Sequence, residues 1–358
     1  MGSSGTVSLQ NASGSVRDLA DRVIATPDQT LSTAEFALAD WKVRLRSTCR
    51  KTTEIYSSRL RSPRTPAADD SACLTLNIIE TRVLGWTAPE SYPDWRRPGH
   101  FEQILRESGF RGVYLKATEC EAGTDFCTIF DPLRQMGMQL VENISDLPTW
   151  EAAAPCRILL NLAAVSRGCC LVHAATLSLA DEGVLIVGPS GAGKSGTALA
   201  GISAGLKTAG DDYVLVSPTC PPTAFRVYNV FKQDQNRLSR INGLAGATAR
   251  MKKSWKNKLE FDPEEIFPGC VVERVRLRAI LAPKIAYAPR TRFVQVDPQR
   301  VFHQLAPSLW IQLPGAQVSA FRFATWLTRS LPTYRAFLSD EPAEIGDTIG
   351  RFIAGLAT

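Results

Sequence analysis

The pattern of polar and apolar positions distinguishes a polar stretch at the N-terminus from the rest of the chain. Residues 1–30 are rich in Ser, Gly, Thr and Asp and show little periodicity, which predicts a loosely ordered arm. The pattern over 34–45 predicts a helix. Pro, Ser and Ala accumulate over 62–72, a composition typical of a linker. We therefore expect residues 1–70 to form an arm and a helix.

A second part, residues 71–150, contains short apolar runs of strand length. The runs are Leu74–Ile79, Gly112–Leu115, Phe126–Phe130 and Met138–Val141, and a helical stretch, Phe101–Glu107, stands among them. Short apolar runs separated by polar turns are typical of strands. The pattern predicts a small α+β accessory domain.

The third part, residues 151–358, mixes strand and helix patterns. Strand-like runs are Leu171–Leu177, Val184–Val187, Tyr213–Val216, Phe225–Val230, Leu277–Ala282 and Phe293–Val296. Helical patterns cover 150–167, 194–206, 318–329 and a stretch that begins near Pro342. This mixture predicts an α/β (α+β) fold class. We expect the first two strand-like runs to pair as a hairpin.

Between two of these elements, an apolar strand and a helix, lies the pattern G-x-x-x-x-G-K-S. Its residues are Gly188, Pro189, Ser190, Gly191, Ala192, Gly193, Lys194 and Ser195, and Gly196 follows. In such a loop, backbone N–H groups surround phosphate oxygens, the lysine supplies positive charge and the serine hydroxyl can hold Mg²⁺. The pattern and its context predict a site for nucleotide phosphates.

Two adjacent acids, Asp211 and Asp212, stand where the next strand-like run begins. Beside a bound nucleotide, one carboxylate can ligate a metal ion and the other can accept a proton from an attacking hydroxyl. The alternative is an ordinary turn with capping acids. His173 lies in an apolar strand and is either a core residue or, if the hairpin forms, a neighbour of the loop.

Composition and charge add constraints but no function. The chain has 358 residues, of which 44% are hydrophobic, enough for a normal core. The net charge of +6 does not by itself imply a nucleic-acid partner. The nine cysteines contain no CxxC pair, which favours reduced thiols and a cytoplasmic protein. No apolar stretch approaches the roughly 20 residues that span a bilayer, so no membrane partner is expected.

The sequence does not support two other classes of nucleotide-binding protein, transporter ATPases and GTPases. No LSGGQ-like signature of a transporter ATPase is present, and the string nearest to the NKxD motif of a GTPase, residues 257–260, follows Lys-rich sequence. Segment 237–258 is basic throughout, with Arg237, Arg240, Arg250, Lys252, Lys253, Lys256 and Lys258. It predicts either a solvated loop or a mobile lid over nucleotide or an acidic substrate. No nucleic-acid-binding motif accompanies it.

His173, the G-x-x-x-x-G-K-S loop and the Asp pair together resemble the catalytic half of the HPr kinase/phosphorylase family. The core of this resemblance covers residues 168–217, and a looser likeness extends to about 355. It implies that residues 151–358 form a P-loop kinase core of the phosphoenolpyruvate-carboxykinase-like type, preceded by the accessory domain at 71–150.

The resemblance also implies roles for single residues. Lys194 and Ser195 would hold nucleotide phosphate and Mg²⁺. Asp211 would be the general base and Asp212 a metal ligand. His173 would be the active-site histidine.

Two departures from the family pattern restrict what the resemblance implies. Gly196 follows the loop serine where HPr kinases usually carry Glu, and no Arg-Gly-x-Gly stretch follows downstream; residues 268–270, Pro-Gly-Cys, do not replace it. Such departures fit HPr-kinase-like proteins that phosphorylate hydroxyls other than that of HPr.

We therefore expect an ATP-dependent, Mg²⁺-dependent kinase that acts on a serine or similar hydroxyl of a protein or peptide. Two alternatives stay open. One is a regulatory or scaffold protein that binds nucleotide without transfer, and the other is a kinase of a small metabolite. The sequence also leaves open whether the chain forms a homo-oligomer.

Overall fold

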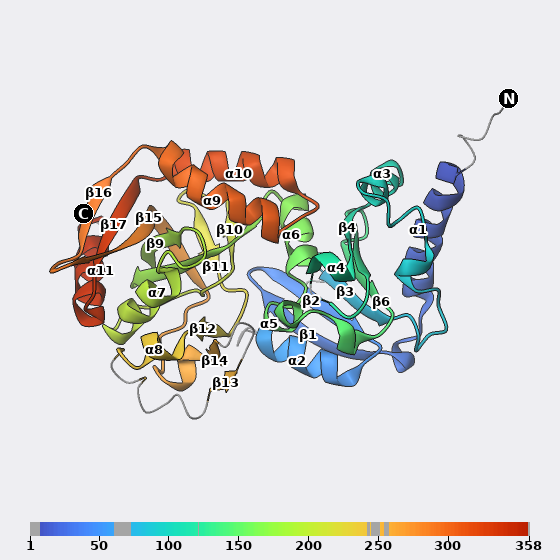
Figure 1. The fold of residues 1–358 in the computed structure, drawn as a ribbon, viewed down its shortest axis with the longest axis horizontal. Helices are drawn as coiled ribbons and strands as arrows, with labels where there is room; N and C mark the ends of the chain where they lie inside the picture. Colours follow the sequence, from blue (N-terminus) through green and yellow to red (C-terminus); the bar gives the residue numbers. More distant parts are fainter. Residues whose placement is uncertain are drawn as a thin grey trace. The chain divides into compact units, whose positions relative to one another are not determined.

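The computed structural model describes residues 8–60, 73–120, 122–241, 244, 251–253 and 258–356 (Figure 1). The chain divides into two compact units. Unit 1 comprises residues 1–166 and 314–316, and unit 2 comprises residues 167–313 and 317–358.

Unit 1 is built on a six-stranded mixed sheet with the strand order β1-β2-β3-β6-β5-β4. Its strands are β1 (Ser32–Leu38), β2 (Trp41–Ser47), β3 (Cys73–Glu80), β4 (Arg111–Leu115), β5 (Phe126–Asp131) and β6 (Met136–Val141). The three central strands, β2, β3 and β6, run parallel, and the outer pairs are antiparallel. The four strands predicted within 71–150 are confirmed as β3, β4, β5 and β6. They form because their apolar runs are long enough to be buried on a sheet.

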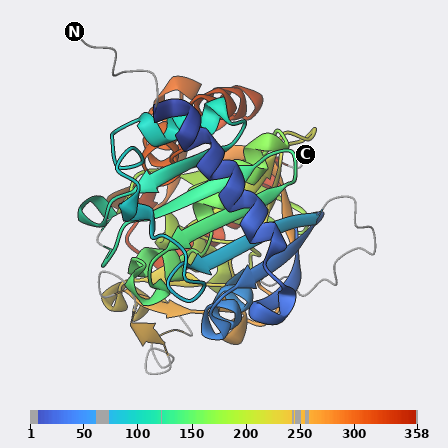
Figure 2. The ribbon, with the colours of Figure 1, turned by 90° about the vertical axis from the view of Figure 1, so that its right-hand side faces the viewer.

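Helices cover both faces of this sheet. They are α1 (Ser8–Ala25), α2 (Arg50–Leu60), α3 (His100–Glu107), α4 (Ala117–Cys120), α5 (Thr149–Ala153) and α6 (Arg157–Ser166). Figure 2 shows α1 crossing one face, where its buried side chains join α3 in a core with Trp95 and Met138. On the other face, Leu159 of α6 packs over Gly137.

The loosely ordered arm expected over 1–30 is wrong for residues 8–25, which form α1, because Val16, Leu19 and Val23 recur at helical spacing and are buried in the core. The expected helix over 34–45 is also wrong. These residues form the hairpin of β1 and β2, with Leu38 opposite Trp41. In β2 the apolar positions Trp41, Val43 and Leu45 alternate with Lys and Arg, a period of two that places them on one face of a sheet.

The two units also differ from the expected division at 70 and 150. Strand β2 pairs with β3, so residues 32–47 and 73–80 belong to one sheet. Helix α6 packs against the same sheet, so unit 1 continues to Ser166. The expected helix over 150–167 is two helices, α5 and α6. The expected linker at 62–72 lies outside the described residues.

Unit 2 holds an eight-stranded mixed sheet and a small three-stranded one. The strands of the larger sheet are β7 (Cys170–Val172), β8 (Ala174–Leu179), β9 (Glu182–Val187), β10 (Val214–Ser217), β11 (Thr223–Phe225), β15 (Arg274–Ala288), β16 (Arg292–Gln295) and β17 (Thr333–Ser339). The smaller sheet consists of β12 (Phe231–Gln233), β13 (Lys252–Lys253) and β14 (Leu259–Phe261). The expected strand over 225–230 is wrong, because the pairing with β15 ends at Phe225.

The larger sheet branches at β15, which pairs with β9, β11 and β17. Strand β9 pairs with β8 on one side and with β15 on the other, and β15 leads through β11 and β10 to β7. Only His173 separates β7 from β8. The predicted hairpin of the two apolar runs is confirmed by the antiparallel pair β8–β9.

The helices of unit 2 form layers on two sides of this sheet. They are α7 (Lys194–Ser203), α8 (Gln235–Leu238), α9 (Pro298–Gln312), α10 (Gln317–Ser330) and α11 (Pro342–Leu356). Figure 1 shows α9 and α10 on one side and α7 and α11 on the other. The α7 and α11 layer buries a core with Leu177, Ile186 and Leu281. Both units combine helices with mixed sheets, so the α+β class is confirmed.

Within the described part of the chain, every helix is too short or too polar to cross a lipid bilayer.

Candidate functional site

A glycine-rich loop, residues 188–195, connects the end of β9 to the first turn of α7. Gly191 has a φ of 82° and Gly193 a φ of 108°, values that side-chain-bearing residues rarely adopt. These conformations let the loop lead directly into α7, whose first N–H groups have no acceptor within the helix. Such a helix N-terminus attracts anions.

Lys194 is buried and folds back into this loop. Its Nζ donates to the carbonyl oxygen of Gly188 at 2.8 Å and to that of Pro189 at 3.3 Å. Burial lowers the pKa of the Lys194 ammonium, while the carboxylates of Asp211 and Asp212 oppose that change. The loop thus has a fixed cation inside it and two anions within electrostatic range.

The topology of the sheet explains why the Asp pair meets the loop. Strand β10 pairs antiparallel with β7, and Val214 lies opposite Val172. The residues just before β10 therefore lie beside His173, the residue just after β7. Strand β8 then pairs with β9, with Ala174 opposite Val187, so His173 is beside the start of the loop. The structure brings together His173, the loop and the Asp pair.

Asp211 is the more buried of the two acids. Its Oδ1 has no hydrogen-bond partner among the described residues. Burial raises the pKa of the Asp211 carboxyl, and the negative charge of Asp212 raises it further, although the Ser195 hydroxyl and the Lys194 ammonium act in the opposite direction. A buried carboxylate with a raised pKa and an unused oxygen is suited to accept a proton.

Asp212 is one-third exposed and holds two ion pairs. Its Oδ1 lies 3.3 Å from Nε2 of His173, and its Oδ2 lies 2.9 Å from Nζ of Lys232. Burial alone would raise the pKa of Asp212, but Lys232 and His173 outweigh it and hold that pKa well below its usual range. Asp212 is therefore the acid that stays ionised.

The backbone at Asp212 is strained. Its φ is 72°, in the left-handed region, and the N–H of Tyr213 bonds the carbonyl oxygen of Asp211 at 2.9 Å across it. This is the geometry of a γ-turn with a positive φ, which costs free energy and is uncommon. The two carboxyl groups have different surroundings: Asp212 lies against His173 and Lys232, whereas the Ser195 hydroxyl acts on Asp211 by lowering its pKa.

His173 is buried beside the Asp pair. Besides its contact with Asp212, its ring lies 5.3 Å from that of Tyr213, and its Nδ1 has no hydrogen-bond partner among the described residues. The Tyr213 hydroxyl donates to Oε1 of Gln312 in α9 at 2.6 Å. His173 is thus held in place by aromatic packing and by one carboxylate.

Sequence reasoning missed Lys232. It lies in β12, between the buried residues Phe231 and Gln233, and opposite Glu260 of β14. No motif surrounds it, and only the fold of the small sheet brings it to Asp212. Gly196, which follows the loop serine, faces the same strand: a Cβ there would lie 3.6 Å from Nε2 of Gln233.

The basic segment 237–258 is described only in part. Arg237 and Arg240 are exposed, and Lys258 is close enough to Lys194 to lower its pKa. Arg250 and Lys256 lie outside the described residues. Lys252 and Lys253 form β13, which pairs with β14.

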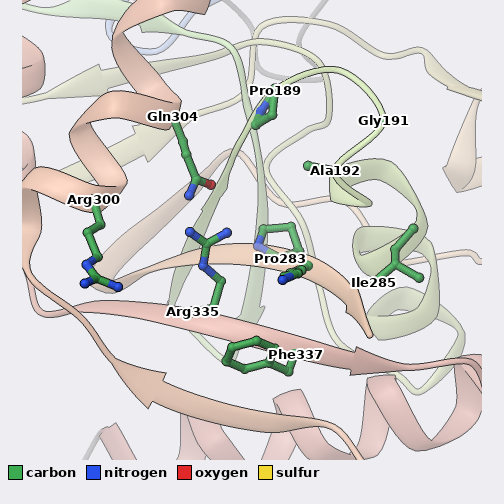
Figure 3. A pocket seen from close by; sticks show the side chains of 10 residues that line it. Pro189, Gly191, Ala192, Pro283, Ile285, Arg300, Gln304, Arg335 and Phe337 are labelled. Carbon is green, nitrogen blue, oxygen red and sulfur yellow. The ribbon is translucent and has the colours of Figure 1, made fainter. Parts of the chain in front are cut away.

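A cavity of about 600 Å³ flanks the loop on the side of β15 and β17 (Figure 3). Its lining residues come from the loop, β15, α9 and β17: Pro189, Gly191, Ala192, Pro283, Lys284, Ile285, Arg300, Gln304, Arg335 and Phe337. Neither α9 nor β17 was expected from the sequence, so this cavity was missed as well.

The donors for a divalent metal ion lie at one place. The Ser195 hydroxyl and the carboxyl groups of Asp211 and Asp212 are the hard oxygen ligands that Mg²⁺ prefers. Among the described residues, no group of three or more His, Cys, Asp or Glu side chains has the arrangement of a metal site. This donor set fits Mg²⁺, which takes one or two protein carboxylates and completes its coordination with phosphates and water.

No protein-family model matches the chain, and no curated protein matches it. Among solved structures, the HPr(Ser) kinase/phosphatase from Coxiella burnetii is similar with 14% sequence identity and a TM-score of 0.29. The similarity covers 52% of this chain and 99% of that one.

Proposed function

We propose that this chain is an ATP-dependent kinase that transfers the γ-phosphoryl group to a serine or similar hydroxyl of a protein or peptide. One observation carries the proposal. A buried carboxylate with an unused oxygen and a raised pKa, that of Asp211, lies against a glycine-rich helix N-terminus that contains a buried lysine. Phosphate recognition and a proton acceptor are thereby adjacent, and phosphoryl transfer to a hydroxyl needs both.

Each part of the site has a role in this reaction. The loop N–H groups and Lys194 stabilise negative charge on the phosphoryl group in flight. Asp211 accepts the proton of the acceptor hydroxyl while the oxygen of that hydroxyl forms a bond to the γ-phosphorus. The bond from that phosphorus to the β–γ bridging oxygen breaks, and ADP leaves with the electron pair.

Ser195 and Asp212 would hold Mg²⁺. When bound, this ion neutralises phosphate charge. Asp212 suits this role because its low pKa keeps it ionised. In the described structure the ammonium of Lys232 lies against it, so Lys232 would have to turn from Asp212 toward the phosphates.

The Ser195 hydroxyl lowers the pKa of Asp211, and this favours a second assignment, in which Asp211 serves the metal and Asp212 takes the proton. The two assignments predict different magnesium dependence. If Asp212 is the ligand, Asp212→Asn requires a higher Mg²⁺ concentration for half-maximal transfer, and Asp211→Asn does not. The reverse result would exchange the two roles.

The direct test follows label from γ-³²P-ATP to serine-containing proteins and peptides. Asp211→Asn should lower transfer by about 100-fold or more, as loss of a general base does, while ATP affinity changes little. Lys194→Ala should weaken ATP binding itself, because it removes the buried cation. The exposed Asp181→Asn, in the turn between β8 and β9, serves as the matched control and should behave as wild type.

Full transfer by Asp211→Asn would refute its role as the base. Unchanged ATP affinity in Lys194→Ala would refute the nucleotide site.

Gly196 favours a second candidate, a regulatory protein that binds nucleotide without transfer. The position has room for a side chain next to Gln233 but carries none, so the site lacks the carboxylate usual in HPr kinases. Tight ATP binding with no label transfer to any protein, peptide or small hydroxyl compound would support this candidate. Label transfer to a metabolite alone would indicate a small-molecule kinase.

A further inference from the structure

The cavity beside the glycine-rich loop combines flat apolar surface with positive charge. Pro283, Ile285 and Phe337 supply the apolar part, and Arg300, Arg335 and Lys284 supply the charge. Figure 3 shows Phe337 and Arg335 on β17 and Arg300 and Gln304 on α9, with Pro189 and Ala192 of the loop above them.

Arg335 is held in position by a neighbour within the cavity, and Nζ of Lys284 lies 5.9 Å from the centre of the Phe337 ring. With its amide oxygen facing β17, Gln304 accepts from Nη1 of Arg335 at 3.0 Å. No carboxylate lines the cavity, and among the described residues no ion pair includes Arg300, Arg335 or Lys284. Unpaired guanidinium groups around an apolar floor suit a ligand with a flat ring and polar or anionic substituents.

Strand pairing places this cavity and the acids on opposite flanks of the loop. Strand β9 pairs with β8 on one side, next to His173 and the Asp pair. On its other side β9 pairs with β15, and β17 follows, which carries Arg335 and Phe337. A triphosphate chain in the loop therefore has the acids at one flank and the cavity at the other.

We propose that this cavity binds the base and ribose of the nucleoside triphosphate. Phe337, Pro283 and Ile285 contact the base, and Arg300 and Arg335 contact the ribose hydroxyls. This inference rests on the proposed function, since it needs the phosphates in the loop. The volume of about 600 Å³ lies within the range of small-molecule sites. The acceptor hydroxyl then approaches from the flank of Asp211.

The test compares two probes with the full chain: Mg·ATP and inorganic tripolyphosphate with Mg²⁺, which has the phosphates but no nucleoside. Binding is measured by calorimetry. Phe337→Ala should weaken ATP binding by about tenfold, the usual effect of losing a base–aromatic contact, and should change tripolyphosphate binding by less than about twofold.

Two further variants keep the test independent of folding. Arg300 is exposed on α9, so Arg300→Gln should leave the fold intact and still weaken ATP binding more than tripolyphosphate binding. Arg322→Gln removes an equally exposed arginine from α10, outside the cavity, and should bind both probes as wild type does.

Three results would overturn the inference. One is unchanged ATP affinity in both Phe337→Ala and Arg300→Gln. Another is equal weakening of ATP and tripolyphosphate, which would mean that the cavity only supports the loop. The third is a raised KM for the acceptor with unchanged ATP affinity, which would make the cavity an acceptor site.

Lys194→Ala separates failure of the inference from failure of the proposed function. If Lys194→Ala binds neither probe while Phe337→Ala and Arg300→Gln bind both normally, the phosphate site is supported and only the assignment of the cavity to the nucleoside is refuted. If the wild-type chain binds neither probe, both proposals fall.

Discussion

Two neighbouring carboxyl groups, those of Asp211 and Asp212, have pKa values shifted in opposite directions. Burial is the largest influence on both and acts to raise both pKa values. The difference comes from partners: Asp212 lies against Lys232 and His173, whereas one oxygen of Asp211 has no hydrogen-bond partner in the described structure. Opposed shifts of this kind accompany a division of acid–base roles.

Substitution of each acid should therefore change stability with opposite sign. At neutral pH, Asp211→Asn removes a buried charge and should raise the free energy of unfolding by about 1 kcal/mol. Asp212→Asn breaks two ion pairs and should lower it by about 1 kcal/mol, a modest effect because water screens a side chain that is one-third exposed. Urea unfolding of the two variants and the wild type measures both.

The pH dependence of these effects follows from the same pKa shifts. The folded-state pKa of Asp211 is raised, so the ionised Asp211 carboxylate destabilises the folded state at pH values above that pKa. This destabilisation, which Asp211→Asn removes, fades as the pH falls through the folded-state pKa toward the ordinary pKa of an aspartate. The folded-state pKa of Asp212 is lowered, so its contribution is present above the ordinary value and is lost as the pH falls through the folded pKa. Destabilisation by Asp211→Asn at neutral pH would contradict this account.

At the scale of elements, helix α11 packs closely against α7, the helix that begins with Lys194. A Cβ on Gly346 would lie 2.3 Å from the carbonyl oxygen of Ala200 in α7, closer than real contacts allow. Gly346→Ala should therefore push the helices apart and destabilise the protein by about 1–3 kcal/mol. Thermal unfolding, followed by circular dichroism, measures the loss.

Gly350→Ala provides the matched control on the same helix. Its Cβ would meet Leu206 at 3.6 Å, an ordinary contact. Alanine also favours a helix over glycine by up to about 1 kcal/mol, so this variant should be as stable as wild type or more stable. A loss equal to that of Gly346→Ala would mean that close packing on α7 is not the cause.

Elements with strong local patterns could be predicted from the sequence, and those that shape the cavity could not. The apolar run of β9, the glycine pattern and the start of α7 predict the loop within a residue or two. Helix α9 was missed because Pro307 lies inside it, and a proline argues against a helix. A signal was nevertheless present: Asp297 caps the N–H of Gln299 at 2.7 Å, with Pro298 in the first turn.

At the scale of the whole molecule, the residues of the site meet through pairings between distant segments. His173 and the Asp pair could be proposed from the sequence, because the hairpin and the strand after α7 are local. Lys232 could not, since its approach to Asp212 depends on the small sheet that joins β12 to β14. The extent of unit 1 could not be predicted either, because β2 pairs with β3, and residues 48–72 separate the two strands in the sequence.

All residues of the candidate site and of the cavity belong to unit 2, which leads to a prediction for the full chain. A ligand that binds the folded state at 100 times its Kd stabilises that state by about 2.7 kcal/mol. With saturating Mg·ATP, amide hydrogen exchange should therefore slow most in the loop, in the turn before β10 and in α9 and β17. The sheet strands β3 and β6 of unit 1 should exchange as without ligand. Lys194→Ala should abolish the protection. Protection confined to unit 1, or its persistence in Lys194→Ala, would place nucleotide binding elsewhere in the chain.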